Sequence, residues 1–241
     1  MYSPDQETDS PAMLVHFLGR IEFARCLDLQ HRLVRQSEDR SDGQISVLLC
    51  EHPGIITIGR NGTPAQVPMR AGVLRSRQIE LRWVKRGGGC LLHAPGQLAV
   101  YPIVPLRWHG LSVGEYLDRL QGAVLRTLDE LGISGSTRPE QQGIWGRTGQ
   151  LVAFGIAVRN WVTYHGAFIN ICPPMGLSRL VQTEASEPGS MSCLVAERHQ
   201  PVKMTSVRAE LVRQLSDLFA CERCHIHTGH PLLPARGTSW S

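Results

Sequence analysis

The stretch from Gly87 to Leu106 contains no charged residue and is about as long as a membrane-spanning helix. Helix-breaking and polar residues interrupt it at Pro95, Gly96, Gln97, Pro102 and Pro105. Proline lacks the amide hydrogen that a helix interior uses, and a Pro-Gly pair is typical of a turn. We therefore expect a buried strand, a turn and a second buried strand in a soluble protein without a transmembrane segment.

The composition is that of a folded chain of moderate size. The sequence has 241 residues, of which 42% are hydrophobic and 19% are charged. These fractions are sufficient for a hydrophobic core within one large domain. Basic residues exceed acidic residues by 25 to 21, and a net charge of +4 is too small to predict nucleic-acid binding. Lys85 and Lys203 are the only lysines, so arginine supplies nearly all of the positive charge.

The cysteines and the N-terminal segment together indicate the compartment. The sequence has 7 cysteines, an odd number, at irregular spacing. The segment from Met1 to Pro11 is polar and acidic, without the apolar core of a secretory signal peptide. We therefore predict free thiols and a cytoplasmic location.

Apolar periodicity predicts both helices and strands. Three helices are expected, over about 20–37, from Ser112 to Gly132 and over about 205–220. Ser112 and Glu115 form a capping box at the start of the middle helix. Six strands are expected, at 45–50, 55–59, near 80–85, 97–104, 151–158 and 161–171.

These elements favour a single α+β domain, because strands and helices mix without strict β-α-β alternation. We assign the domain to residues 13–235. Residues 1–12 and 236–241 are predicted to be flexible tails.

Two polar segments are candidate sites. The glycines of Arg86-Gly87-Gly88-Gly89 permit close approach of a ligand to the backbone, although a tight hairpin turn is an equally good interpretation. His93 follows this turn, and a lone histidine there is commonly structural. The segment Trp161–Gly166 is the second candidate, with an ordinary strand end as its alternative.

A third segment contains residue types that bind metals, but their spacing does not match a known metal site. Cys221, Cys224 and His225 have the spacing of covalent haem attachment, and His227 adds a further ligand type. Haem attachment requires export, and the spacing fits no standard zinc site. We predict surface thiols near a helix end and no metal.

Two long motifs identify a family resemblance. Residues 51–60 read E-H-P-x-x-x-T-x-G-R, and residues 86–103 read R-G-G-x-x-x-x-H-x-P-G-Q-L-x-x-Y-P-I. With the helix-like segment Gly19–Leu33, Gly143-Ile144-Trp145, Thr163–Gly166 and Asn170, the chain resembles the octanoyltransferases of the LipB type over about residues 14–233.

The resemblance implies a fold, an activity and partners. The fold would be the mixed β-sheet flanked by helices that biotin protein ligases and lipoate ligases share, a class II synthetase-like fold. The activity would be transfer of octanoyl from acyl carrier protein to a lysine of lipoyl domains in lipoate biosynthesis. Octanoyl acyl carrier protein would be the donor, and lipoyl domains of 2-oxoacid dehydrogenases and the glycine cleavage H protein the acceptors. It implies no cofactor, no nucleic acid and no membrane partner.

By the same resemblance, three segments would bind the substrate. They are the loop Arg86, Gly87, Gly88, Gly89, Cys90, Leu91, Leu92 and His93, the segment Ala153, Phe154 and Gly155, and the segment Gly166, Ala167 and Phe168.

The chain departs from the family at the catalytic positions. Gln150 stands where family members carry a lysine that lowers the pKa of the nucleophile, five residues before Gly155. The nucleophilic cysteine of the family aligns near Ser186, and no cysteine occurs from Pro173 to Ser192.

Several chemistries therefore stay open. Ser186 could act with His93 or His165 as its base, and Cys172, Cys193 or Cys90 could substitute for the missing cysteine. Direct presentation of the thioester to the acceptor lysine needs no covalent intermediate. A non-catalytic relative that binds octanoyl or lipoyl groups, or lipoyl domains, is the alternative. An ATP-dependent ligase is disfavoured, because related ligases use a lysine beside the acyl-adenylate.

Overall fold

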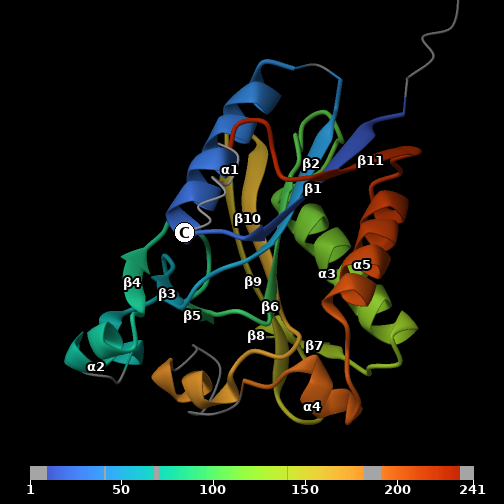
Figure 1. Cartoon of the computed structure of the whole chain (residues 1–241). Helices are drawn as coiled ribbons and strands as arrows, with labels where there is room; N and C mark the ends of the chain where they lie inside the picture. Colours follow the sequence, from blue (N-terminus) through green and yellow to red (C-terminus); the bar gives the residue numbers. More distant parts are fainter. Residues whose placement is uncertain (1–9, 41, 68–70, 140, 182–190, 234–241) are drawn as a thin grey trace, which may run out of the picture.

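A mixed sheet of eight strands forms the centre of the computed structural model, which describes residues 10–40, 42–67, 71–139, 141–181 and 191–233 (Figure 1). Its order is β11 (Arg223–Thr228), β1 (Ala12–Arg20), β2 (Ile45–Glu51), β6 (Gln97–Ile103), β10 (Val162–Asn170), β9 (Gln150–Arg159), β8 (Gln141–Trp145) and β7 (Ser136–Arg138). The pairs β11–β1 and β1–β2 are parallel and the other pairs are antiparallel. The α+β fold predicted from the sequence is thereby confirmed.

A second, smaller sheet lies beside the lower end of the large one (Figure 1). Its order is β4 (Glu80–Trp83), β3 (Ile55–Ile58) and β5 (Cys90–His93). The predicted strand, turn and strand of the uncharged stretch are β5 and β6. None of the described helices is long and apolar enough to cross a membrane.

Helices cover both faces of the large sheet. α1 (Phe23–Glu38) lies on one face, and α3 (Val113–Glu130) and α5 (Met204–Leu218) lie side by side on the other (Figure 1). Shorter elements are η1 (Pro64–Gln66), α2 (Ala71–Ser76), η2 (Met175–Leu180) and α4 (Leu194–Arg198).

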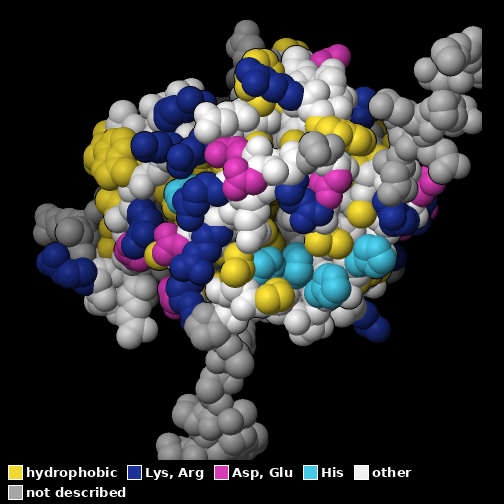
Figure 2. Space-filling model, turned by 90° about the horizontal axis from the view of Figure 1, so that it is seen from above, with side chains coloured by type: hydrophobic (Ala, Val, Ile, Leu, Met, Phe, Trp, Pro, Cys, Tyr) yellow, Lys and Arg dark blue, Asp and Glu magenta, His cyan; other side chains and the backbone are white. Residues whose placement is uncertain are grey.

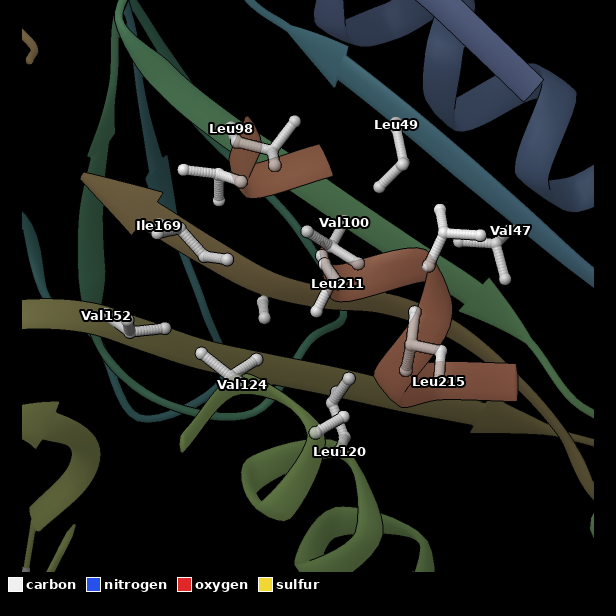
Figure 3. Packing of buried hydrophobic residues seen from close by; sticks show 14 of the residues in the cluster. Val47, Leu49, Leu98, Val100, Leu120, Val124, Val152, Ile169, Leu211 and Leu215 are labelled. Atoms are coloured by element: carbon white, nitrogen blue, oxygen red, sulfur yellow. The ribbon is translucent and has the colours of Figure 1, made fainter. Parts of the chain in front are cut away.

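The period-two pattern of the strands separates two hydrophobic cores. Val47 and Leu49 of β2, with alternate residues of β6, face α3 and α5 (Figure 3). The intervening residues, Leu48 and Cys50 of β2 among them, face α1. The start of α3 is the predicted capping box, since the Glu115 amide donates to Ser112 Oγ over 3.2 Å.

The boundaries at the start of the domain differ slightly from those expected. Of the predicted tails, residues 1–9 and 236–241 lie outside the described residues, while Ala12 begins β1 and the Ser10 hydroxyl donates to Ala220 O. The first helix begins at Phe23 rather than near residue 20, which is the last residue of β1. β1 joins the sheet by parallel pairing with β2 and β11, a contact between distant segments that local patterning does not show.

The predicted pair of surface thiols at residues 221 and 224 is half correct. Cys224 is exposed, whereas Cys221 is buried. Cys224 and His225 are consecutive residues of β11, so their side chains point to opposite faces of the sheet. This alternation keeps them from sharing one ion.

Candidate active site

The Arg86–Gly89 loop lies against β9. The Gly87 amide donates to Ile156 O over 2.8 Å. A Cβ added to Gly155 would lie 2.6 Å from Arg86 Cδ, so glycine is needed for this close approach. The first predicted substrate-binding segment therefore contacts the second, 153–155.

The second and third predicted segments pair with each other across β9 and β10. Gly155 stands opposite Gly166, and Phe154 stands opposite Ala167. A Cβ on Gly166 would lie 2.1 Å from Val100 O in the neighbouring strand β6. The fold thus brings together three segments that are far apart in the sequence.

A fully buried arginine anchors the loop. Arg86 is 0% exposed, and its guanidinium donates to Thr57 O at 2.9 Å, Thr57 Oγ1 at 2.7 Å and Gly87 O at 2.9 Å. A buried charge is stabilised by hydrogen bonds, and here three oxygen acceptors bind the two terminal nitrogens of the guanidinium. Arg86 therefore fixes the loop to β3 rather than presenting a charge to solvent.

His93 continues the same hydrogen-bond chain. Because Arg86 donates to Thr57 Oγ1, the Thr57 hydroxyl donates to His93 Nε2 over 2.9 Å. His93 Nδ1–H then donates to Gln97 Oε1 over 3.0 Å, and Gln97 Nε2 donates to Asn170 Oδ1 over 2.8 Å. Burial, together with nearby His52 and Arg86, holds the pKa of His93 well below its usual value, so the ring is neutral.

His165 is the buried polar ring without such bonds. Its backbone amide donates to Gln30 Oε1 over 2.8 Å, and its φ of 57° lies in the left-handed region. Neither ring nitrogen has a hydrogen-bond partner among the described residues. Burial, with Arg86 adding to it, lowers the pKa of His165 to about 3, so this ring is neutral as well.

Aromatic rings connect the two histidines. Phe23 of α1 stacks on both, with ring centroids 5.5 Å from His93 and 6.2 Å from His165. Phe168 lies edge-on to His93 at 4.5 Å. Tyr101 lies 6.3 Å from His165. The two histidines therefore lie in buried, largely apolar surroundings, and both imidazoles are neutral.

The candidate nucleophiles do not lie together in the structure. Ser186 lies outside the described residues. Cys172 is exposed, and its amide donates to Gly96 O over 2.9 Å, just beyond the β10 end that holds Asn170. Cys193 is buried at the start of α4, and the buried Cys90 thiol donates to Thr63 O.

Gln150 is buried at the start of β9. Its side-chain amide donates to Gln142 O over 3.4 Å, and its carbonyl accepts from the Ser192 amide over 2.9 Å. A neutral amide in this position supplies no electric field to lower the pKa of a thiol.

Several residues of the site received no role from the sequence. Thr57, Gln97, Tyr101 and Asn170 all lie within the quoted motifs, yet only the folded chain shows what each contacts. Gln30 lies within the first predicted helix, and the sequence assigned it no role. Its position beside Leu29 and Leu33 in a buried helix surface was the available signal.

A separate cavity of about 1010 Å³ opens over β1 and β11. His16, His227 and His230 line it, with His16 Nδ1–H donating to Gly229 O, and none of its lining residues belongs to the three predicted segments. Figure 2 shows histidine side chains gathered on the face seen from above. The three histidines come from opposite ends of the chain, so no local sequence pattern predicts this cavity.

The comparisons with known proteins decide the family. The model of the lipoyl protein ligase A/B catalytic domain matches residues 22–216. A protein of Chloroflexus aurantiacus named octanoyltransferase is 34% identical over 215 residues, which is 87% of this chain and 95% of that protein. This chain belongs to the lipoyl protein ligase A/B family. An octanoyltransferase of Nitratidesulfovibrio vulgaris is 32% identical to it, and the match covers 86% of this chain and 94% of that protein.

Solved structures confirm the fold of this lipoyl protein ligase A/B family member. The bipartite lipoate protein ligase of Thermoplasma acidophilum superimposes with a TM-score of 0.72 at 13% identity, over 92% of this chain and 88% of that one. A lipoate-protein ligase A bound with ATP gives a TM-score of 0.70 at 14% identity, over 92% and 90% of the two chains. The predicted lipoate ligase-like fold is thereby confirmed.

Proposed function

We propose that this chain is an octanoyltransferase that moves octanoyl from octanoyl acyl carrier protein to a lysine of a lipoyl domain, in lipoate biosynthesis in the cytoplasm. The observation that carries this proposal is that the three segments, 86–93, 153–155 and 166–168, lie next to one another in the fold. Relatives named octanoyltransferase match nearly the whole chain, which supports the same assignment.

The site suits a medium-length acyl chain. Phe168, Tyr101 and Ala157 supply buried apolar surface on the face of the sheet that α1 covers, whereas Phe154 and Ala167 face α3 and α5. Burial of each methylene group is worth about 0.8 kcal/mol, so an octanoyl tail gains several kcal/mol in such surroundings. The Arg86 loop would then enclose the acyl chain against β9.

The two neutral histidines have different roles in this proposal. Both His93 nitrogens are engaged by protein groups, which makes His93 a positioning residue. His165 has ring nitrogens free of described protein partners, so it is the group we assign to the thioester carbonyl or the incoming amine. Replacing His93 with Ala is expected to reduce the rate of octanoyl transfer. An unchanged rate would show that His93 has no role in the site.

We assign the covalent step first to Cys172. Its side chain is exposed, and it lies two residues after Asn170, which is linked to His93 by hydrogen bonds through Gln97. Its thiolate attacks the thioester carbonyl, and the carrier leaves as a thiol. The lysine amine then attacks the new thioester, forming the amide and returning the proton and the thiol to Cys172. Ser186 is the second assignment, and it requires a base such as His165 because a hydroxyl is much less acidic than a thiol.

Intact-mass analysis tests the proposal. The purified chain is mixed with octanoyl acyl carrier protein and an apo lipoyl domain, without ATP. We expect octanoyl on the domain and, transiently, on the enzyme. Cys172→Ser should abolish the enzyme adduct, whereas Cys224→Ser, the other exposed cysteine, should leave it unchanged. If the adduct persists in Cys172→Ser and disappears in Ser186→Ala, the nucleophile is Ser186.

Two results would overturn the proposal. An unmodified lipoyl domain that the chain still binds would identify a non-catalytic binding protein. Modification that appears only with ATP and free octanoate would identify a ligase.

The acyl carrier protein donor is proposed from charge. Arg25, Arg32 and Arg35 are exposed on α1, and Figure 2 shows basic side chains spread over the face seen from above. α1 begins at Phe23, which stacks on both site histidines, and the three arginines extend from there along the exposed side of the same helix. An acidic carrier would be attracted to this surface. Arg32→Glu is expected to raise KM for the carrier with little change in kcat.

A further inference from the structure

Two thiols and an imidazole meet behind the acyl site, in the core between α1 and the sheet. Cys26 of α1, Cys50 of β2 and His52 just after β2 are 0%, 3% and 1% exposed. One ligand atom from each residue lies within 4.8 Å of the others. Cysteine and histidine in this arrangement are the ligand types that zinc prefers.

The distances are close to those of a tetrahedral zinc site. Bond lengths of about 2.3 Å to sulfur and about 2.05 Å to nitrogen place two sulfurs about 3.8 Å apart and a sulfur and a nitrogen about 3.5 Å apart. Cys26 Sγ and Cys50 Sγ are 3.8 Å apart, and Cys50 Sγ lies 3.6 Å from His52 Nε2. Two of the three ligand-to-ligand distances therefore already match a zinc site. Only the distance from Cys26 Sγ to His52 Nε2 would have to shorten when the ion binds.

Neighbouring groups orient the ligands. The His52 Nδ1–H donates to Ile21 O over 2.7 Å, which leaves the lone pair on Nε2, the nitrogen that lies 3.6 Å from Cys50 Sγ. Such a carbonyl partner is the usual orienting contact of a metal-binding histidine. The Gln30 amide lies 3.8 Å from Cys26 Sγ as a donor. The Tyr101 hydroxyl donates to the lone pair on His52 Nε2 over 2.8 Å, and an ion would replace that hydrogen bond and leave the Tyr101 oxygen beside the fourth position.

We propose that Cys26, Cys50 and His52 bind a structural zinc ion behind the acyl site, with Tyr101 oxygen or water as the fourth ligand. Binding releases the two thiol protons to solvent, so Zn²⁺ and two thiolates form a neutral unit. A neutral unit suits a site that is closed to water, whereas Cu⁺ with two thiolates would bury a net negative charge.

The proposed ion is linked to the acyl site through Gln30. This side chain donates toward Cys26 Sγ and accepts the His165 amide over 2.8 Å. An ion that fixes Cys26 therefore also fixes the left-handed turn at His165. Zinc binding would stabilise the folded chain, because the unfolded chain lacks the assembled ligands.

Metal analysis of the full-length chain tests this inference independently of transfer activity. The protein is purified under reducing conditions from zinc-supplemented cells, without chelator, and its zinc content is measured by mass spectrometry. We expect stoichiometric zinc in the unaltered chain and in Cys224→Ser, and a content lowered roughly tenfold or more in Cys26→Ala and Cys50→Ala.

A second measurement covers the case in which these core variants do not fold. The unaltered chain is unfolded, freed of metal and refolded with Co²⁺. Thiolate-to-cobalt charge-transfer bands are expected, and they should also form in Cys224→Ser. Three results would overturn the inference: unaltered protein without zinc or cobalt bands, variants with undiminished zinc, or a mass two hydrogens lower that maps to a Cys26–Cys50 disulfide.

Discussion

The Thr57 hydroxyl joins Arg86 to His93, and its removal tests how the site is built. It accepts from the Arg86 guanidinium over 2.7 Å and donates to His93 Nε2 over 2.9 Å, and Thr57 is 0% exposed. Thr57→Val keeps the branched shape and the volume but deletes both hydrogen bonds. The buried His93 acceptor is then unpaired, while Arg86 keeps its bond to Thr57 O.

The magnitude follows from these contacts. An unpaired buried acceptor costs about 1–3 kcal/mol, and a hydrogen bond to a charged group contributes about 1.5–3 kcal/mol. Because Arg86 retains other acceptors, we expect Thr57→Val to lower the free energy of unfolding by about 2–4 kcal/mol. With a urea dependence of about 3 kcal/mol per molar, the midpoint shifts by roughly 1 M.

Urea unfolding followed by circular dichroism measures this shift. Thr57→Ser is the control, because it keeps the hydroxyl and loses only a methyl group. A double-mutant cycle with His93→Leu isolates the pair: the cost of Thr57→Val should fall by about 1 kcal/mol or more when His93 is absent. A Thr57→Val protein within about 0.5 kcal/mol of the parent would refute the proposed hydrogen-bond chain.

Three further predictions concern other parts of the molecule. Gly166→Ala places a Cβ 2.1 Å from Val100 O and should abolish folding into soluble protein, whereas Gly72→Ala, with no atom within 4 Å, should leave the yield unchanged. The pKa of His165 is lowered to about 3 in the folded chain, so its contribution to stability is complete above the unfolded value near 6.5 and is lost as pH falls below it. His165→Asn should therefore reduce the slope of unfolding free energy against pH, measured between pH 5 and 6, by about 1.4 kcal/mol per pH unit. Ser112→Ala removes the cap of α3 and should lower thermal stability by about 1 kcal/mol, measured by calorimetry, while Ser112→Asp should restore most of it.

Local patterns in the sequence were sufficient for most of the elements. The uncharged stretch gave β5 and β6, and the capping box gave the start of α3, because helix and strand periodicity is a property of neighbouring residues. β1 and β11 were not predicted from the sequence. Their exposed or mixed patterns become strands only through parallel pairing between opposite ends of the chain.

The family motifs located the site without giving its geometry. The register that sets Gly155 opposite Gly166 depends on how two strands align, and the bond from the His165 amide to Gln30 joins residues 135 positions apart. No local pattern encodes such a pair.

The sequence by itself determined the three long helices, most strands and the family. Only the tertiary structure decided that Arg86 and His93 share one hydroxyl, that the predicted pair Cys221 and Cys224 is split between core and surface, and that Cys26, Cys50 and His52 meet. The physical reason is that hydrogen bonding and metal ligation act over a few ångströms in space. The chain brings these groups within that range only by packing α1 onto the sheet.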